Sequence, residues 1–451
     1  MGWNNNFLKK VKEKSLVIGV VGLGYVGLPT ALSFYQSGFT IWGIDNSLSV
    51  ISKLNKGQNP TGDPSLDGRI PNIKDKKWNV TNSFSESISN CDVILVTVPT
   101  PVNEDKSMDS SYVLQSGESV FSNLTSNSNT IVILESTVYP GSTNELWLPL
   151  VKKYELEIGK DITLAYCPER HNPGDLKNNI STVARVIGCN DNVIGKELVY
   201  LYSELTSGNV RYVGKIEVAE SAKLVENIQR DINIALVNEL AIILPHLGVD
   251  VEDVLDAAST KWNFHRYKPG LGVGGHCIPI DPYFIIDKAK FQGLSANLVS
   301  SARKINELMP SVTSKQIKKI LLSHYSNNKS SFNALIMGWS YKADIGDARE
   351  SPSLHLFNEL TNLNIKVKCY DPYFDKNEMN DDFNFINNLN DISDIDILIL
   401  ATAHSEFIDM DWSNYIHIMN KPLIFDGRRC LNLKNMEEIG WSTYAIGKPI
   451  N

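Results

Sequence analysis

The chain has 451 residues, of which 42% are hydrophobic and 21% charged, and its formal net charge is −8. This length is sufficient for two or three domains with separate cores. The acidic balance argues against a nucleic-acid coat, although it leaves room for a locally basic pocket that binds an anionic small molecule. No apolar run approaches the ~20 residues that span a bilayer, and the six cysteines lack paired spacing. We therefore expect a cytoplasmic protein without nucleic-acid or membrane partners.

A dinucleotide-binding pattern lies near the start of the chain. A β-branched apolar run at 17–21 is followed by a GxGxxG turn and then by a helical pattern to about Gln36. In such a turn the first glycine permits the bend, the second lets the pyrophosphate approach the backbone, and the third lets the helix pack on its strand. The phosphates then lie at a helix N-terminus. The turn residues expected to contact the cofactor are Gly22, Gly24, Tyr25, Val26 and Gly27.

A second predicted strand, at 40–44, ends at Asp45. This carboxylate lies at the distance from the glycine turn that is expected of the acidic residue that binds a ribose diol. It would repel a 2′-phosphate, so the pattern predicts NAD rather than NADP as the cofactor. A kinase glycine loop is the alternative, but it would lie between two strands and precede a lysine signature that this sequence lacks.

Further apolar runs alternate with helical or loop segments and predict a doubly wound, mainly parallel sheet of the α/β class. These runs are at 93–98, 131–134, 162–166 and 183–187. Ligands of such sheets bind beyond the carboxyl ends of the strands. Thr100, Thr137 and Glu169 follow three of the runs and are candidates by position, the two threonines for the cofactor, although threonine is equally typical of turns.

One long helix is predicted from Ile216 to about Leu247, with no helix breaker before Pro245. Lys223 and Asn227 are four residues apart on it and share a face, which could point into a cleft. A solvated lysine on an amphipathic helix is the alternative. A helix of this length between two α/β regions also suggests a connector that carries a dimer interface.

A glycine-rich stretch at 272–284 presents Cys277 next to His276 and four residues before Asp281. Glycines let the backbone approach a ligand closely, and a thiol among polar neighbours is typical of a nucleophile. Free cysteine is also a common small core residue, and this alternative stays open. A metal site is not favoured, because His276 and Cys277 are adjacent and lack a second spaced pair of ligands.

After a helical region at 287–323 and a polar linker at 326–331, the alternation of strands and helices begins again. Strands are predicted at 334–338, 366–370, 395–401 and 423–425, and a helix at 352–363. This second, smaller Rossmann-like unit lacks a GxGxxG turn, but its cations suit a pyrophosphate unless they belong to a solvated surface. These cations are Lys342, Arg349, Arg428 and Arg429.

The predicted architecture is two Rossmann-like doubly wound domains joined by a long central helix. The expected ranges are 1–214 for an NAD-binding domain, 215–325 for a central helical domain with the Cys277 loop, and 326–451 for the C-terminal domain.

Nine motifs together resemble the UDP-glucose/GDP-mannose dehydrogenase family over nearly the whole chain. They are, in order, GLGYVGLP, Asp45, VPTP, EST, CPER, the Lys223/Asn227 helix, GGHCIPIDP, YKADIGDARESP and DGRR. CPERHNPGD at 167–175 and TKWNF at 260–264 are most similar to the branch that oxidises UDP-N-acetylhexosamines for bacterial capsule or O-antigen synthesis.

The resemblance implies a four-electron oxidation of the sugar C6 hydroxymethyl group to a carboxylate with two NAD in succession. Cys277 would attack the aldehyde formed by the first hydride transfer, and the thiohemiacetal would then be oxidised to a thioester. Glu169, with Thr137, is similar to the residue that handles the hydrolytic water. Lys223, Asn227 and Asp281 match the positions that handle the C6 oxygen and its proton.

The resemblance also implies that the C-terminal unit holds the UDP moiety, and that the protein is a homodimer or higher homo-oligomer. Arg349 would reach NAD, and Arg266 would project into the partner subunit's site. The expected substrate-binding residues are Glu169, Arg170, Lys223, Asn227, Arg266, Tyr267, Gly274, Lys342 and Arg428.

UDP-N-acetylglucosamine is the expected substrate. UDP-GalNAc, UDP-ManNAc and UDP-glucose are the alternatives, because no short motif fixes the C4 configuration. A catalytically silent protein that binds NAD or a UDP-sugar is the hypothesis from another class. It is disfavoured because Cys277, Lys223 and Glu169 are all present.

Overall fold

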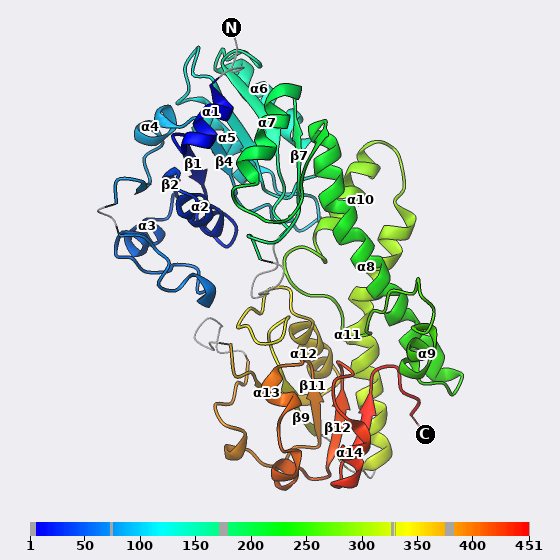
Figure 1. Cartoon of the computed structure of the whole chain (residues 1–451). Helices are drawn as coiled ribbons and strands as arrows, with labels where there is room; N and C mark the ends of the chain where they lie inside the picture. The colour runs from blue at the N-terminus through cyan, green and yellow to red at the C-terminus, as the bar shows by residue number, and fades with distance from the viewer. Residues whose placement is uncertain are drawn as a thin grey trace. The chain divides into compact units, whose positions relative to one another are not determined.

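The computed structural model describes residues 6–72, 75–170, 179–325, 329, 331–374 and 383–450. The chain divides into two compact units, Met1–Glu226 and Asn227–Asn451. The boundary falls within helix α8 (Ile216–His246), which begins in the first unit and continues into the second (Figure 1). The division into three domains at 214 and 325 stays a prediction. Within the described residues, no helix is long and apolar enough to cross a membrane.

The first unit is built on an eight-stranded sheet in the order β3-β2-β1-β4-β5-β6-β7-β8. All neighbouring strands are parallel except β6 and β7, which are antiparallel. The strands are β1 (Val17–Val21), β2 (Thr40–Ile44), β3 (Trp78–Thr81), β4 (Val93–Val96), β5 (Thr130–Leu134), β6 (Ile162–Tyr166), β7 (Arg185–Cys189) and β8 (Val210–Gly214). The first six strands have the order of a dinucleotide-binding fold, in which the ligand lies where the strand order reverses, here at β1 and β4.

Helices pack on this sheet, and its central strands are buried, which is why they are continuous apolar runs in the sequence. The helices described in this unit before α8 are α1 (Phe7–Glu13), α2 (Gly27–Gln36), α3 (Leu48–Asn55), α4 (Phe84–Ser87), α5 (Ser111–Phe121), α6 (Ser142–Lys153) and α7 (Asn192–Tyr202). On one face, Val20 belongs to the same buried cluster as Leu32 of α2 and Leu198 of α7. Helices α5 and α6 meet at Gly117, where a side chain would come within 2.6 Å of Trp147 Nε1.

The second unit contains a five-stranded, all-parallel sheet in the order β10-β9-β11-β12-β13. Its strands are β9 (Phe332–Met337), β10 (Ile365–Tyr370), β11 (Ile397–Leu400), β12 (Leu423–Asp426) and β13 (Ser442–Ala445). This is the order of a flavodoxin-like doubly wound fold, whose ligands bind at the reversal between β9 and β11. Alternate strand residues enter two cores, Ile336 and Ile399 on one face and Leu335 and Leu398 on the other, as the period of two requires.

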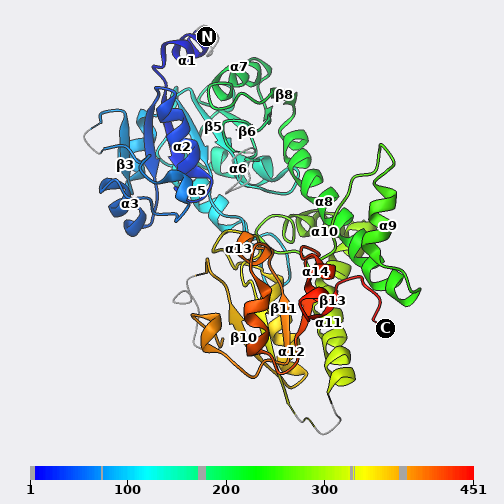
Figure 2. The same cartoon turned by 60° about the horizontal axis from the view of Figure 1, so that its bottom comes forward.

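Helices cover both faces of the second sheet (Figure 2). They are α9 (Val251–Ala258), α11 (Asn297–His324), α12 (Pro352–Asn362), α13 (Ser405–Ile408) and α14 (Leu433–Glu438), together with the second half of α8. Helix α10 (Asp281–Phe291) packs on α11. Leu321 of α11 and Leu356 of α12 belong to one core, and Phe407 of α13 and Met436 of α14 to the other.

The structure confirms the α/β class and two Rossmann-like sheets. The region at 287–323, expected to be helical, contains two helices, α10 and α11. Gly293 ends the first one with φ of 71°, and its N–H donates to Lys290 O at 3.0 Å, a left-handed helix end that glycine favours. Helix α10 also begins earlier than expected, at Asp281, because Pro282 suits the first turn of a helix. The polar linker predicted at 326–331 lies mostly outside the described residues.

Candidate active site

The glycine turn of the first unit has the geometry that close packing and ligand approach require. Gly22 has φ of 90°, a conformation that favours glycine. A Cβ on Gly27 would lie 1.8 Å from Gly22 O and 2.3 Å from Thr97 Oγ1, whereas a Cβ on Gly24 would meet nothing within 4 Å. Gly27 therefore permits helix α2 to pack, and Gly24 faces open space where a pyrophosphate can approach the backbone.

Asp45 lies at the carboxyl end of β2, half-buried beside this turn. Its Oδ2 accepts a hydrogen bond from Leu23 N at 2.8 Å, and its Oδ1 accepts one from Ser47 N at 2.8 Å. A carboxylate has about four acceptor positions, so two stay available for ribose hydroxyls. The open Gly24 and this carboxylate fit NAD, whose phosphates would be held at the N-terminus of α2, which begins after Tyr25 and Val26.

The loops after β4 and β5 are tied together beyond the carboxyl ends of the sheet. Thr100 Oγ1 donates to Thr137 O at 2.7 Å, and Ser136 Oγ donates to Val98 O at 2.6 Å. The hydroxyl of Thr100 therefore has a structural role in joining the two loops. Thr137 is half-buried in the second of these loops, directly after Ser136.

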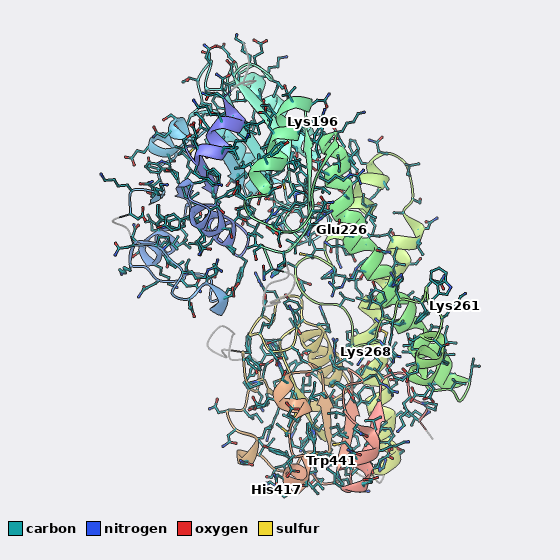
Figure 3. The ribbon with its side chains drawn as sticks, viewed as in Figure 1. Lys196, Glu226, Lys261, Lys268, His417 and Trp441 are labelled. Atoms are coloured by element: carbon teal, nitrogen blue, oxygen red, sulfur yellow. The ribbon has the colours of Figure 1, made fainter. Side chains whose placement is uncertain are left out.

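Glu169 is buried after β6, where its side chain forms an ion pair with the fully buried Arg185 of β7. Its Oε1 also accepts from Arg170 N at 2.6 Å. Lys223 of α8 donates from Nζ to Glu169 O at 2.8 Å, so the structure brings two predicted site residues together. Arg170 pairs with Glu226, which Figure 3 labels on α8.

A buried polar cluster supports Glu169, and sequence reasoning did not identify it. Tyr202 donates to Glu135 Oε1 at 2.6 Å, and the guanidinium of Arg185 lies over the Tyr202 ring at 5.5 Å. Burial alone would lower the pKa of Arg185, but the carboxylates of Glu169 and Glu135 raise it above its ordinary value. Burial raises the pKa of the neighbouring Cys167 thiol to about 12. Only contacts between distant strands reveal this cluster.

In the second unit, Cys277 is exposed at the start of α10. Its carbonyl oxygen accepts from Ile280 N at 3.1 Å and from Asp281 N at 2.8 Å, so the backbone of the cysteine forms part of the helix start. Asp281 is 2% exposed and accepts from Asn227 Nδ2 at 2.5 Å. The alternative of a cysteine packed in the core is therefore wrong.

The glycines before Cys277 contact the loop that follows β9. A Cβ on Gly274 would lie 2.7 Å from Glu350 O, and Gly275 N donates to Arg349 O at 3.3 Å. His276 Nε2 lies 3.6 Å from Asp347 Oδ2. Gly274 is therefore required by close packing between the two loops of this unit.

The side chain of Arg349 is held by another residue of the same loop. Its Nε and Nη2 donate to the two carboxylate oxygens of Asp347 at 2.9 and 2.6 Å. Burial opposes ionisation of Asp347, but the hydrogen bonds from Arg349 and His276 outweigh it and lower the pKa of that carboxyl. A reach of Arg349 toward NAD stays a prediction.

The remaining predicted cations and Tyr267 have distinct surroundings. Arg428 lies beside Gly270, on which a Cβ would be 2.9 Å from Arg428 Nη1, and burial lowers the pKa of its guanidinium. Arg266 forms ion pairs with Glu252 and Asp256 of α9. Tyr267 packs against the core of the second unit.

Three further basic side chains lie in the second unit. Lys268, labelled in Figure 3, donates to Arg429 O at 3.3 Å, and Arg429 pairs with Asp250 at 2.7 Å. Lys342 lies in the loop after β9, half-buried. Among the described residues, no three His, Cys, Asp or Glu side chains are arranged to hold a metal ion.

Three family models match the chain in order. They describe the NAD binding domain, the central domain and the UDP binding domain of the UDP-glucose/GDP-mannose dehydrogenase family, and they match residues 16–206, 217–308 and 335–433. A UDP-N-acetyl-D-glucosamine 6-dehydrogenase of Pseudomonas aeruginosa is 36% identical over 404 residues, covering 89% of this chain and 93% of that protein. Protein CapL of Staphylococcus aureus is 35% identical, covering 92% and 96%. Among solved structures, a UDP-D-ManNAc dehydrogenase from Pyrococcus horikoshii superposes with a TM-score of 0.86 at 31% identity, covering 96% and 99%.

Proposed function

Because the chain belongs to the UDP-glucose/GDP-mannose dehydrogenase family and is an NAD-dependent UDP-sugar dehydrogenase, we propose that it oxidises C6 of UDP-N-acetylglucosamine to the carboxylate through a covalent intermediate on Cys277. The observation that carries the proposal is the placement of this thiol. Cys277 is exposed and lies four residues before Asp281. The buried carboxylate of Asp281 accepts a hydrogen bond from Asn227 Nδ2 at 2.5 Å. A nucleophilic cysteine needs this accessibility and a fixed polar surrounding.

When bound, NAD supplies the hydride acceptor, one molecule in succession for each of the two hydrides that leave C6. The first unit would hold it through the backbone at Gly24 and the carboxylate of Asp45, the groups that fit it geometrically. Lys223 and Asn227 would bind the C6 oxygen. The Lys223 ammonium would stabilise the negative charge that develops on that oxygen as its proton leaves.

Cys277 would act in the second half of the reaction. Its thiolate forms an S–C bond to the aldehyde carbon, and the carbonyl oxygen takes up a proton, giving a thiohemiacetal. Loss of the second hydride and of the hydroxyl proton converts this adduct to a thioester. Water then attacks the thioester carbon, the S–C bond breaks, and the thiolate is regenerated. Holding the aldehyde covalently keeps this reactive species from escaping before its second oxidation.

Glu169 would orient or deprotonate the hydrolytic water. Its burial and its ion pair with Arg185 fix the carboxylate in place, and Thr137 would assist it. Because the folded protein already holds this carboxylate in place, little further entropy is lost when it orients the water for reaction.

The second unit would bind the UDP moiety. Its strand order places the loop with Lys342 beyond the reversal between β9 and β11, and Arg428 directly after β12, where doubly wound sheets bind anions. A guanidinium and an ammonium suit a pyrophosphate. Gly274, Tyr267 and Arg170 are proposed to line the sugar side. Arg266 is proposed to act across the dimer, with Glu252 and Asp256 as its partners when no second subunit is bound.

We further propose a homodimer formed along the long helix. Helix α8 exposes Leu236 and Ile243, whose spacing of seven residues places them on one face, and the exposed Leu247 follows directly after the helix ends at His246. Exposed apolar residues gathered on one helix face are typical of an interface. Light scattering of Ile243→Glu against Lys261→Glu, an exposed residue outside this face, tests it. A monomeric Ile243→Glu supports the dimer, and an unchanged mass contradicts it.

The test of the substrate is the initial rate of NADH formation with UDP-GlcNAc, UDP-GalNAc, UDP-ManNAc and UDP-glucose. The 36% identical relative named for UDP-N-acetyl-D-glucosamine supports the first of these, and the product would serve bacterial surface polysaccharide synthesis. The highest kcat/KM is expected for UDP-GlcNAc. A higher kcat/KM for another sugar would change the assigned substrate and leave the proposed reaction unchanged. Binding of NAD without turnover of any of the four would favour the silent binder.

A further inference from the structure

A row of three polar residues lies along one face of α8 in the second unit. Asn227, Asp231 and Asn238 are spaced by four and seven residues, so they point to the same side of the helix. Asp231 and Asn238 are fully buried, and buried polar groups of this kind are kept in a fold only when each is hydrogen-bonded. Their partners connect α8 to α11 and to the loop that carries Cys277.

The partners form one continuous chain of hydrogen bonds. Asn306 Nδ2 of α11 donates to Asp231 O at 3.1 Å and to Asp231 Oδ1 at 2.8 Å. Asn238 Nδ2 donates to Asn306 Oδ1 at 2.8 Å, and Asn238 Oδ1 accepts from Gly270 N at 2.9 Å. Arg303 Nη1 adds a bond to Asp231 Oδ1 at 2.6 Å.

The donor-to-acceptor direction of this series of hydrogen bonds is fixed at both ends by backbone groups. The carbonyl oxygen of Asp231 can only accept, so it requires the NH₂ group of Asn306 to face it. The oxygen of Asn306 then faces Asn238 and requires that residue's NH₂ group. The oxygen of Asn238 is left for the N–H of Gly270, which can only donate. Turning over the amide of Asn238 would break two hydrogen bonds, and turning over that of Asn306 would break three.

We propose that Asn238 is a positioning residue for the nucleophile, because it fixes the start of the 270–281 loop while Asn227 fixes its end at Asp281. The two asparagines are eleven residues apart, about 16 Å along the helix, and Cys277 lies between the two anchored points. The loop contains four glycines, Gly270, Gly272, Gly274 and Gly275, whose backbone freedom must be restrained if the thiol is to occupy one position. The role assigned to Cys277 rests on the proposed function, but the anchoring of the loop does not.

The experiment uses the whole chain and three variants. Asn238→Ala removes the acceptor of Gly270 N–H. Asn238→Asp keeps that acceptor and, when protonated, also the donor to Asn306. Asn233→Ala is the matched control, because Asn233 lies on the same helix and donates only to Gln229 O at 2.8 Å, within the helix itself. Hydrogen exchange is followed in a peptide that spans residues 266–277, and thermal unfolding checks the fold.

In Asn238→Ala the amide hydrogens of this peptide are expected to exchange at least tenfold faster than in the wild type. In Asn238→Asp and Asn233→Ala their exchange rates should stay within about threefold of the wild type. With substrate, Asn238→Ala is expected to slow the second oxidation at least tenfold and to leave the Kd for NAD unchanged. Exchange in Asn238→Ala that matches Asn233→Ala would overturn the proposal.

The wild type alone also tests the anchor if Asn238→Ala does not fold. A protected amide at Gly270 supports the proposal, and exchange at the rate of an open glycine loop overturns it. Failure of the wild type to oxidise any UDP-sugar would refute the proposed function but would leave the exchange result valid.

Discussion

The two sheets carry an aspartate at the same topological position and use it differently. Asp45 follows β2 and Asp371 follows β10, each beside the turn after the first strand of its unit. Asp45 is half-buried and accepts two backbone hydrogen bonds. The Asp371 side chain is fully buried. It accepts from His404 Nε2 and from the backbone N–H groups of Trp339, Ser340, Tyr373 and Phe374.

The difference shows how one fold supports two kinds of loop. In the first unit a tight glycine turn leaves a carboxylate with free acceptor positions for a ribose. In the second unit the carboxylate is saturated, so its function is to hold a longer loop that carries cations. Asp344 of that loop strengthens this attachment, because its N–H donates to His404 Nδ1 and its carboxylate accepts from Ser405 N. Asp45 is therefore expected to affect binding, and Asp371 to affect stability.

The largest effect is expected from Cys277→Ser, which removes the proposed nucleophile of the second unit and leaves the first unit unchanged. Formation of the acid should fall by on the order of 10³-fold, since a serine hydroxyl is a far weaker nucleophile at neutral pH. The Kd for NAD, measured by calorimetry, should not change. Cys91→Ser is the control, because Cys91 is buried in the first unit and donates to Ser87 O, as a serine can. Full turnover to the acid by Cys277→Ser would refute the covalent role.

Asp371→Ala should destabilise the second unit by about 3 kcal/mol, because it leaves several buried donors without an acceptor. Burial alone would raise the pKa of Asp371, but the bonds from His404 and Ser340 outweigh it and lower that pKa. The stabilisation is therefore complete above the ordinary aspartate pKa of about 4 and is lost as the pH falls through the lower folded-state value. Denaturant unfolding at neutral and acid pH measures both effects. If the free energy of unfolding of Asp371→Ala at pH 7 equals that of the wild type, the hydrogen bonds to Asp371 do not stabilise the second unit as described.

Asp45→Ala should weaken NAD about tenfold, or about 1.4 kcal/mol, through the lost ribose contact. Calorimetry with NAD gives the Kd directly. Asp67→Ala, an exposed aspartate of the same unit, controls for the loss of one charge. If the Kd for NAD stays at the wild-type value in Asp45→Ala, the two aspartates do not differ in the way described above.

The smallest effect on stability is expected for Gly24→Ala. Its Cβ would meet nothing within 4 Å, so the free energy of unfolding should change by about 0.5 kcal/mol or less, whereas NAD binding should weaken because the methyl group occupies the approach of the pyrophosphate. Gly27→Ala is the matched contrast, since its Cβ would lie 1.8 Å from Gly22 O. Equal destabilisation of the two variants would show that Gly24 and Gly27 do not have the separate binding and packing roles described above.

Much of the fold could be predicted because its signals are local. The strands at 17–21 and 40–44 and the helix from Ile216 match the structure closely, since buried parallel strands are continuous apolar runs and nothing breaks the helix before Pro245. Strands β3, β8 and β13 were missed. They are short or partly exposed, so their sequences lack the apolar run that marks a central strand.

Candidate site residues could be identified where a motif marks them. Spacing and residue type alone single out the glycine turn, Asp45 and Cys277 as candidates. The supporting residues were not found, because Arg185, Asn238 and Asn306 become significant only through partners distant in the sequence, such as Glu169 and Gly270. A buried asparagine within a helix has no local pattern that separates it from a solvated one.

The most direct test of the account is the number of NADH molecules formed per UDP-GlcNAc consumed at completion by the wild-type enzyme. The account predicts two, because the aldehyde stays bound to Cys277 until it is oxidised again. One NADH per sugar, with free aldehyde in solution, would contradict the central claim that the second unit holds the intermediate covalently.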